Sequence, residues 1–109
     1  TSTALNDPAE TLAIKMVLGN AAQGVPISST KSMTGHLIGA SGGIETIATA
    51  LMIENGGIHA TINLDTPGEG CDLFYVPRKA IRKDISKAIN NSFGFGGQNA
   101  SLLLNRYDA

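Results

Sequence analysis

Large aromatic side chains and cysteine are scarce in this sequence of 109 residues, which has three phenylalanines, two tyrosines, no tryptophan and one cysteine. A lone cysteine excludes an internal disulfide framework and is typical of a reducing compartment. No leader of charged, then apolar, then small residues opens the chain. We therefore expect a cytoplasmic protein, or an organellar one if a longer parent protein carries a transit peptide.

Charge and long apolar runs are scarce as well. The net charge of −1 gives no electrostatic footprint for nucleic acid. No apolar run approaches the roughly 20 residues that a membrane-spanning helix needs. We expect neither a nucleic-acid partner nor a membrane span.

The composition is otherwise that of a globular chain with one modest core, because 42% of the residues are apolar and 16% are charged. Thirteen glycines favour close backbone packing and tight turns over a core filled by large rings. The chain opens on threonine and not on methionine, so we expect a processed or excised piece of a longer protein.

Two helices are expected. The first starts where Asp7 caps free amides, with Pro8 in the first turn and Glu10 reaching back, and it runs to about residue 18, before Gly19. The second occupies much of residues 35–55, which carry one apolar stripe. Its first half is rich in glycine, so it requires close packing to outweigh poor helix propensity.

The remaining apolar runs predict short strands at 25–30, about 59–63, 73–76, 85–91 and 100–106, with a glycine-rich loop at 92–98 between the last two. This order of elements predicts an α/β fold. So few strands would leave sheet edges and helix faces uncovered. We therefore expect residues 1–109 to form part of a domain that needs upstream sequence.

Three segments resemble the β-ketoacyl-[acyl-carrier-protein] synthase family in their motifs, order and spacing, and the resemblance spans essentially the whole chain. The stretch 1–3, followed by Asp7 and Glu10, looks like the tail of the family's His-Gly-Thr-x-Thr motif, whose histidine would lie two residues before Thr1. Residues 31–37, Lys-Ser-Met-Thr-Gly-His-Leu, are similar to the second histidine motif. Residues 91–99 are similar to the C-terminal glycine-rich loop.

The resemblance implies a thiolase-like fold of five layers, α-β-α-β-α, with this chain supplying much of the second half, and a homodimeric enzyme of fatty acid synthesis. In that family a cysteine thiolate accepts an acyl group, malonyl carrier loses carbon dioxide, and the enolate attacks the acyl thioester. Substrates arrive on the phosphopantetheine arm of acyl carrier protein, the expected partner. The enzyme itself is expected to need no cofactor and no metal.

By resemblance, His36 is one of two histidines that stabilise the charge developing on a thioester oxygen, a contribution of ~3–4 kcal/mol per hydrogen-bond donor. A histidine that merely caps a helix is the plain alternative, and the surrounding motif weighs against it. Lys31 would add positive potential, and the family pairs it with a glutamate that maps to Glu45. We interpret Glu45 as structural support, because a carboxylate among small apolar neighbours needs a partner.

The glycine-rich loop carries the third element. By resemblance it offers a backbone N–H to the oxyanion hole, and Phe95 gates the acyl pocket while Gly94, Gly96 and Gly97 let the backbone approach substrate and move. An ordinary hairpin loop is the alternative. Thr1 and Thr3 resemble the threonines that bind the phosphopantetheine amides.

Several other residues attract attention and are set aside. Cys71 lacks the family's nucleophile context and is expected to be a small buried residue. His59 has no matching ligand spacing. The basic residues at 78, 79, 82 and 83 suit a solvated turn better than a docking site for acidic carrier protein.

Three readings remain beside the elongating fatty acid synthase. A polyketide ketosynthase shares all three motifs, a chain-length-factor-like partner subunit keeps the fold without the cysteine, and a small interaction module is the third. Intact Lys31 and His36 weigh against a non-catalytic subunit. Because the nucleophilic cysteine and the first histidine would lie upstream, we expect this chain alone to be inactive.

Overall fold

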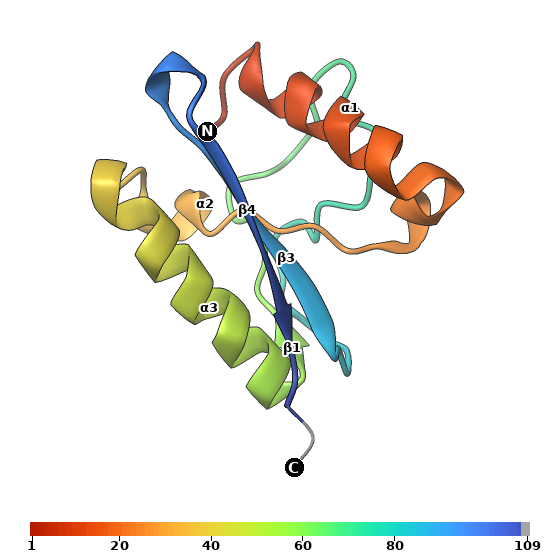
Figure 1. Ribbon diagram of the computed structural model, residues 1–109. Coiled ribbons are helices and arrows are strands. Elements are labelled where there is room, and N and C mark those ends of the chain that lie inside the picture. The colour runs from red at the N-terminus through yellow and green to blue at the C-terminus, as the bar shows by residue number, and fades with distance from the viewer. Residues whose placement is uncertain (108–109) are drawn as a thin grey trace.

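The computed structural model describes residues 1–107 and shows three helices flanking two separate pairs of strands. In chain order the elements are α1 (Asn6–Leu18), the 3-10 turn η1 (Gly19–Gly24), α2 (Lys31–Thr34), η2 (Ile38–Ala40), α3 (Ser41–Asn55), β1 (Gly57–Ile58), β2 (Ile81–Arg82), β3 (Lys87–Phe93), η3 (Phe95–Gly97) and β4 (Asn99–Asn105). Helix α3 runs along the β3–β4 hairpin, and α1 lies well away from α3 (Figure 1).

Helix α1 confirms the first expected helix but begins differently. It starts at Asn6, whose N–H donates to Thr3 Oγ1 over 3.2 Å. Asp7 lies inside the first turn, and its carboxylate accepts the N–H of Ser2 at 3.1 Å. The predicted Asp7 cap is therefore wrong, because the turn that precedes the helix already supplies an acceptor. The predicted stop at Gly19 is confirmed by its positive φ of 55°.

The second expected helix is confirmed only from Ser41 onward. Residues 35–40 leave the α conformation: Gly35 has φ 71° and Ile38 has φ 51°. Glycine is a weak helix former, and side-chain bonds described below stabilise this turn instead. At the other end, Gly56 adopts φ 61° and closes α3 in the left-handed cap that the sequence predicts.

The hairpin of β3 and β4 confirms the two predicted C-terminal strands, with bounds shifted by one or two residues. The strands pair antiparallel from Lys87 opposite Asn105 to Phe93 opposite Asn99. Asn90 is buried against α3 and donates through Nδ2 to Thr46 Oγ1 at 3.0 Å. The hairpin is thus joined to the helix by a buried polar bond.

The predicted strands at 25–30 and 73–76 are wrong, since no strand is assigned there. Single backbone contacts replace them: Ile27 N–H donates to Phe74 O at 2.8 Å, and Thr61 and Pro77 form an isolated parallel bridge. Pro26 and Pro77 carry no N–H for a ladder. The segment expected at 59–63 is likewise displaced, because the paired residues are Gly57 and Ile58, bound to the unforeseen β2.

Apolar side chains remain exposed over several elements, as so small a set of strands led us to expect. They include Leu12, Met16 and Val17 on α1, Ile47 and Leu51 on α3, and Leu102 and Leu103 on β4. The buried apolar residues are few: Ala22, Ile53, Ile58, Ala60, Leu73 and Val76. No helix within residues 1–107 has the length and apolarity to cross a bilayer.

A partly buried pair of hydroxyl groups joins α1 to the rest of the chain and yields a first prediction. Thr11 is buried, and its Oγ1 lies 2.7 Å from the phenolic oxygen of Tyr75. Tyr75→Phe should lower the free energy of unfolding by about 1–3 kcal/mol, because the Thr11 hydroxyl loses its partner. Urea unfolding measures this, with the same change at exposed Tyr107 as the control. Equal stability of the two variants would contradict the assigned role.

Candidate functional site

The histidine motif folds into a tight turn between α2 and η2. Lys31 O accepts the N–H of Gly35 at 2.9 Å, which ends α2, and the positive φ of Gly35 then turns the chain away from the helix axis. Glycine adopts this conformation without the steric cost of a Cβ atom. His36 follows directly and is exposed.

One ring nitrogen of His36 is fixed by its neighbours. Its Nδ1 lies 3.0 Å from the backbone N of Ile38 and 3.2 Å from Ser41 Oγ. A backbone N–H can only donate, so Nδ1 must accept and the proton of the neutral ring resides on Nε2. The turn therefore presents His36 as a hydrogen-bond donor through Nε2.

A buried ion pair lies beside this turn. Glu45 is 5% exposed, and Lys31 Nζ donates to its Oε1. The second oxygen, Oε2, accepts from Ser92 Oγ at 3.4 Å. The pairing of Lys31 with Glu45 that the family resemblance implied is confirmed. The carboxylate contacts groups on α2 and β3 while it belongs to α3, so it ties three elements together.

The glycine-rich loop closes on itself. Gly94 N–H donates to Gln98 O at 2.8 Å, and a Cβ atom on Gly94 would lie only 2.9 Å from that oxygen. Gly96 and Gly97 have φ values of 77° and 79°, which favour glycine. Each of the three glycines therefore has a conformational reason to be glycine.

Phe95 connects the loop to the histidine turn. Its side chain is 86% exposed, and its ring stacks on the His36 ring with centroids 6.4 Å apart and planes 14° from parallel. Two segments separated by almost sixty residues are thus brought face to face. The structure confirms the proximity of these two motifs; the functional roles of His36 and Phe95 stay predictions.

Thr1 and Thr3 occupy the turn before α1. Their hydroxyl oxygens lie 3.1 Å apart. Within residues 1–107, no hydrogen bond joins either side chain to the His36 turn. The expected pantetheine role of Thr1 and Thr3 stays a prediction.

Glu10 lies one turn into α1. Burial raises the pKa of its carboxyl above the ordinary value of 4.5, and Asn6 Nδ2 lies 3.5 Å from its Oε2.

Two serines with contacts at the site were missed by the sequence analysis. Ser41 contacts His36, and Ser92 contacts Glu45. The signal for Ser41 was weak: a serine five residues after the histidine, where a helix could start. The contact of Ser92 depends on how β3 packs on α3, which motif spacing does not reveal.

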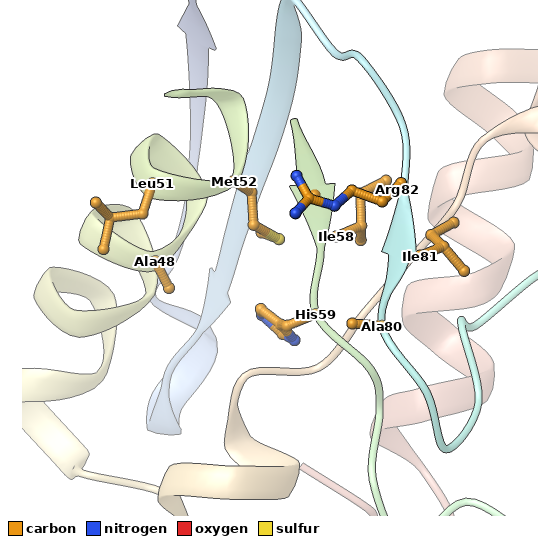
Figure 2. A pocket seen from close by; sticks show the side chains of 9 residues that line it. Ala48, Leu51, Met52, Ile58, His59, Ala80, Ile81 and Arg82 are labelled. Atoms are coloured by element: carbon orange, nitrogen blue, oxygen red, sulfur yellow. The ribbon is translucent and has the colours of Figure 1, made fainter. Parts of the chain in front are cut away.

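His59 has structural partners. Its Nε2 lies 3.0 Å from Thr30 Oγ1 and its Nδ1 lies 3.1 Å from Ala60 O. It borders an apolar hollow between α3 and the β1–β2 pair (Figure 2), lined by Ala48, Leu51, Met52, Gly57, Ile58, His59, Ala80, Ile81 and Arg82. None of the predicted site residues lines this hollow.

Cys71 and the basic turn were also set aside in the sequence analysis. Cys71 is half-buried, whereas a buried cysteine was expected. In the basic turn, Arg78 binds Asp65 at 2.9 Å, and Arg82 Nη1 donates to Asn55 O at 3.4 Å. No group of three or more His, Cys, Asp or Glu side chains in the described part of the chain is placed to hold a metal ion.

Comparison with known proteins identifies relatives of this arrangement. Residues 1–65 match the family model described as the C-terminal domain of β-ketoacyl synthase. The chain is 51% identical over 107 residues to 3-oxoacyl-[acyl-carrier-protein] synthase 2 of Synechocystis, covering 98% of the chain and 26% of the relative. It is 50% identical over 109 residues to the enzyme of the same name from Staphylococcus aureus, again covering 26% of the relative. The chain thus spans about a quarter of the length of these relatives.

Solved structures of ketosynthases are similar to this chain as well. A type II polyketide acyl-carrier protein in complex with its ketosynthase contains a chain that is 44% identical, with a TM-score of 0.94 over 97% of this chain and 26% of that one. A β-ketoacyl synthase from Burkholderia phymatum is 36% identical, with a TM-score of 0.91 over 99% of this chain and 26% of its own. These similarities confirm the expected α/β fold of the thiolase type.

The buried ion pair generates the second prediction. Lys31→Met should lower the free energy of unfolding by up to about 3–5 kcal/mol, because Glu45 would be left charged and unpaired. Adding Glu45→Gln should restore part of that loss, since a neutral amide is easier to bury. Urea unfolding of the single and double variants measures both effects.

A matched control is Lys15→Met. Lys15 pairs with Asp72 on the surface, where solvent screens the interaction. This change should lower the stability far less than Lys31→Met. If the two lysine variants lost similar stability, or if the double variant were no more stable than Lys31→Met, the buried-pair account would be wrong.

Proposed function

Because the chain belongs to the β-ketoacyl synthase C-terminal domain family, we propose that it is part of a 3-oxoacyl-[acyl-carrier-protein] synthase of fatty acid biosynthesis. The observation that carries the proposal is the His36 ring, held as an Nε2 donor and stacked on Phe95 of the glycine-rich loop. The chain contributes part of the site, and the nucleophilic cysteine and the first histidine would come from elsewhere in the synthase. This chain alone is accordingly expected to catalyse no condensation.

The proposed reaction is a decarboxylative Claisen condensation. A cysteine thiolate of the synthase attacks the acyl carrier's thioester and displaces the carrier thiolate. Malonyl carrier then loses carbon dioxide, and the electron pair of the broken C–C bond passes to the thioester oxygen as an enolate. The enolate carbon attacks the enzyme-bound acyl group and releases the cysteine. His36 Nε2–H donates to the oxygen that gains negative charge, where a fixed donor acts most strongly.

Lys31 has a supporting role in this proposal. Because its ammonium group is paired with Glu45, much of its positive potential is cancelled at longer range. Its principal effect is to hold α2, which leads directly into the His36 turn, against α3. A lysine so placed acts on the reaction through the position of His36.

Phe95 is proposed as a gate. Its side chain buries little surface, so rotating it away from His36 sacrifices little packing energy. The flanking glycines permit backbone rotation that other residues would resist. Movement of this ring would open and close the approach to His36.

Partners and location are part of the same proposal. The polyketide neighbour was solved in complex with its acyl-carrier protein. We infer that this synthase also takes its substrates from the phosphopantetheine of a carrier protein, with Thr1 and Thr3 binding the arm, and that it works as a cytoplasmic homodimer without a resident cofactor.

A polyketide ketosynthase is the second candidate, and the 44% identity to the polyketide neighbour favours it. Another neighbour is the ishigamide ketosynthase/chain length factor, at 40% identity. Identities of 49–51% to enzymes named 3-oxoacyl-[acyl-carrier-protein] synthase 2 support the first candidate more strongly. The products distinguish the two candidates. A fatty acid synthase makes a single ketoacyl extension and passes the product on, whereas a polyketide ketosynthase extends the chain repeatedly and retains its keto groups.

The third prediction separates two half-reactions in a full-length synthase that ends in this chain. His36→Ala should abolish decarboxylation of malonyl carrier while the cysteine still accepts an acyl group, because acyl transfer needs mainly the thiolate and the backbone oxyanion hole. Release of labelled carbon dioxide and acyl loading are followed separately. Decarboxylation at the wild-type rate by folded His36→Ala protein would contradict the assignment.

The fourth prediction tests the gate. Phe95→Ala should slow acyl transfer while changing the unfolding free energy far less than the ~3–5 kcal/mol of a core phenylalanine. Stopped-flow acyl loading and urea unfolding of the full-length synthase give the two values. A core-sized loss of stability, with acyl transfer unaffected, would make Phe95 a packing residue instead.

A further inference from the structure

Ser41 is placed where it can control His36. It is the first residue of α3 and is 4% exposed. Its Oγ accepts the backbone N–H of Leu37 at 2.8 Å and lies 3.2 Å from His36 Nδ1. One hydroxyl therefore contacts both the histidine ring and the peptide that follows it.

The hydrogen positions follow from the partners. A serine hydroxyl has one hydrogen and two lone pairs, and the Leu37 N–H uses a lone pair. Nδ1 already accepts from Ile38 N–H, so it carries no proton to give to Ser41. The hydroxyl hydrogen consequently points to Nδ1. Two donors then converge on one nitrogen, and both favour the ring form with its proton on Nε2.

The turn has a conformational reason to need this support. Ile38 adopts φ 51°, a conformation that is costly for a β-branched residue and persists only where surrounding contacts impose it. Ser41 supplies two such contacts from the end of a fifteen-residue helix. Helix α3 thus holds the strained turn at Ile38 in place. Without these contacts the turn would relax and the His36 ring would change its orientation.

The buried face of α3 links this role to the ion pair. Its buried residues recur every four positions: Ser41, Glu45, Thr49 and Ile53. Residues spaced by four share one face of a helix. Ser41 contacts His36 and Glu45 contacts Lys31, one turn further on. Thr49 belongs to the same face, but its Oγ1 donates to Glu45 O at 2.8 Å and makes no hydrogen bond to His36 or Lys31.

We propose that Ser41 is a positioning residue that holds His36 in its Nε2–H tautomer and in the orientation needed to donate to the reacting thioester oxygen. This inference rests on the proposed function for its effect on rate. The tautomer of the ring can be measured without any reaction, so the two are tested apart.

The experiment uses a full-length synthase that ends in this chain, with ring nitrogens labelled by nitrogen-15 histidine and the His36 signals assigned by their loss in His36→Ala. Ser41→Ala should convert the single Nε2–H pattern into a mixture of tautomers. Carbon dioxide release from malonyl carrier should fall roughly tenfold, by analogy with the loss of a residue that orients a metal-binding histidine. Acyl loading of the cysteine should stay near the wild-type rate.

Three further variants complete the test. Ser41→Thr, which keeps the hydroxyl, should restore the Nε2–H pattern and most of the rate. Thr49→Val, a matched loss of a buried hydroxyl on the same helix face, should leave both unchanged. If Ser41→Ala does not fold, Ser41→Cys takes its place, because a thiol is a weaker donor and should give the same changes in milder form.

The proposal is overturned if folded Ser41→Ala, or Ser41→Cys in its place, keeps the wild-type tautomer and decarboxylation rate. It is overturned equally if Ser41→Thr behaves as Ser41→Ala does, or if Thr49→Val reproduces the loss. Wild-type decarboxylation by His36→Ala would instead refute the proposed function, while the ring signals would still report whether Ser41 sets the tautomer.

Discussion

The arrangement of the site depends on satisfying one buried carboxylate. Glu45 is almost fully enclosed, and an unpaired charge in such a place would cost several kcal/mol. Lys31 from α2 and Ser92 from β3 supply its partners, so the charge of one side chain determines where two other elements lie. The turn that carries His36 begins where α2 ends, and the glycine-rich loop begins where β3 ends. Both functional segments are therefore anchored to α3.

Local contacts then fix the shape of the glycine-rich loop and the orientation of the His36 ring. The loop closes on the Gly94–Gln98 backbone bond, at a distance that leaves no room for a Cβ atom on Gly94. This closure presents Phe95 outward, over the His36 ring. At the edge of the ring, Nδ1 accepts its hydrogen bonds from Ile38 and Ser41, leaving Nε2 as the donor. Ring orientation is thus set from α3 and from the loop together.

The family resemblance selected His36, Phe95 and the Lys31–Glu45 pair, and the structure confirms that these residues contact one another in pairs, while their roles stay predictions. Regular patterns in the sequence predicted α1 and the β3–β4 hairpin. The predictions failed at 25–30, where Pro26 lacks a ladder donor, and at 73–76, which Pro77 follows directly. They failed also at 35–40, where side-chain bonds hold a non-helical turn. Ser41 escaped notice because its role arises from a contact across that turn, which apolar periodicity does not encode.

The central claim is that His36 Nε2 donates to the thioester oxygen that becomes negatively charged. The most direct measurement is a crystal structure of a full-length synthase ending in this chain, with a non-hydrolysable malonyl-pantetheine analogue bound. The account predicts Nε2 about 2.7–3.1 Å from the thioester oxygen, with Nδ1 still accepting from Ile38 N–H. An Nε2 beyond hydrogen-bond reach, or a ring flipped so that another atom faces the oxygen, would contradict it.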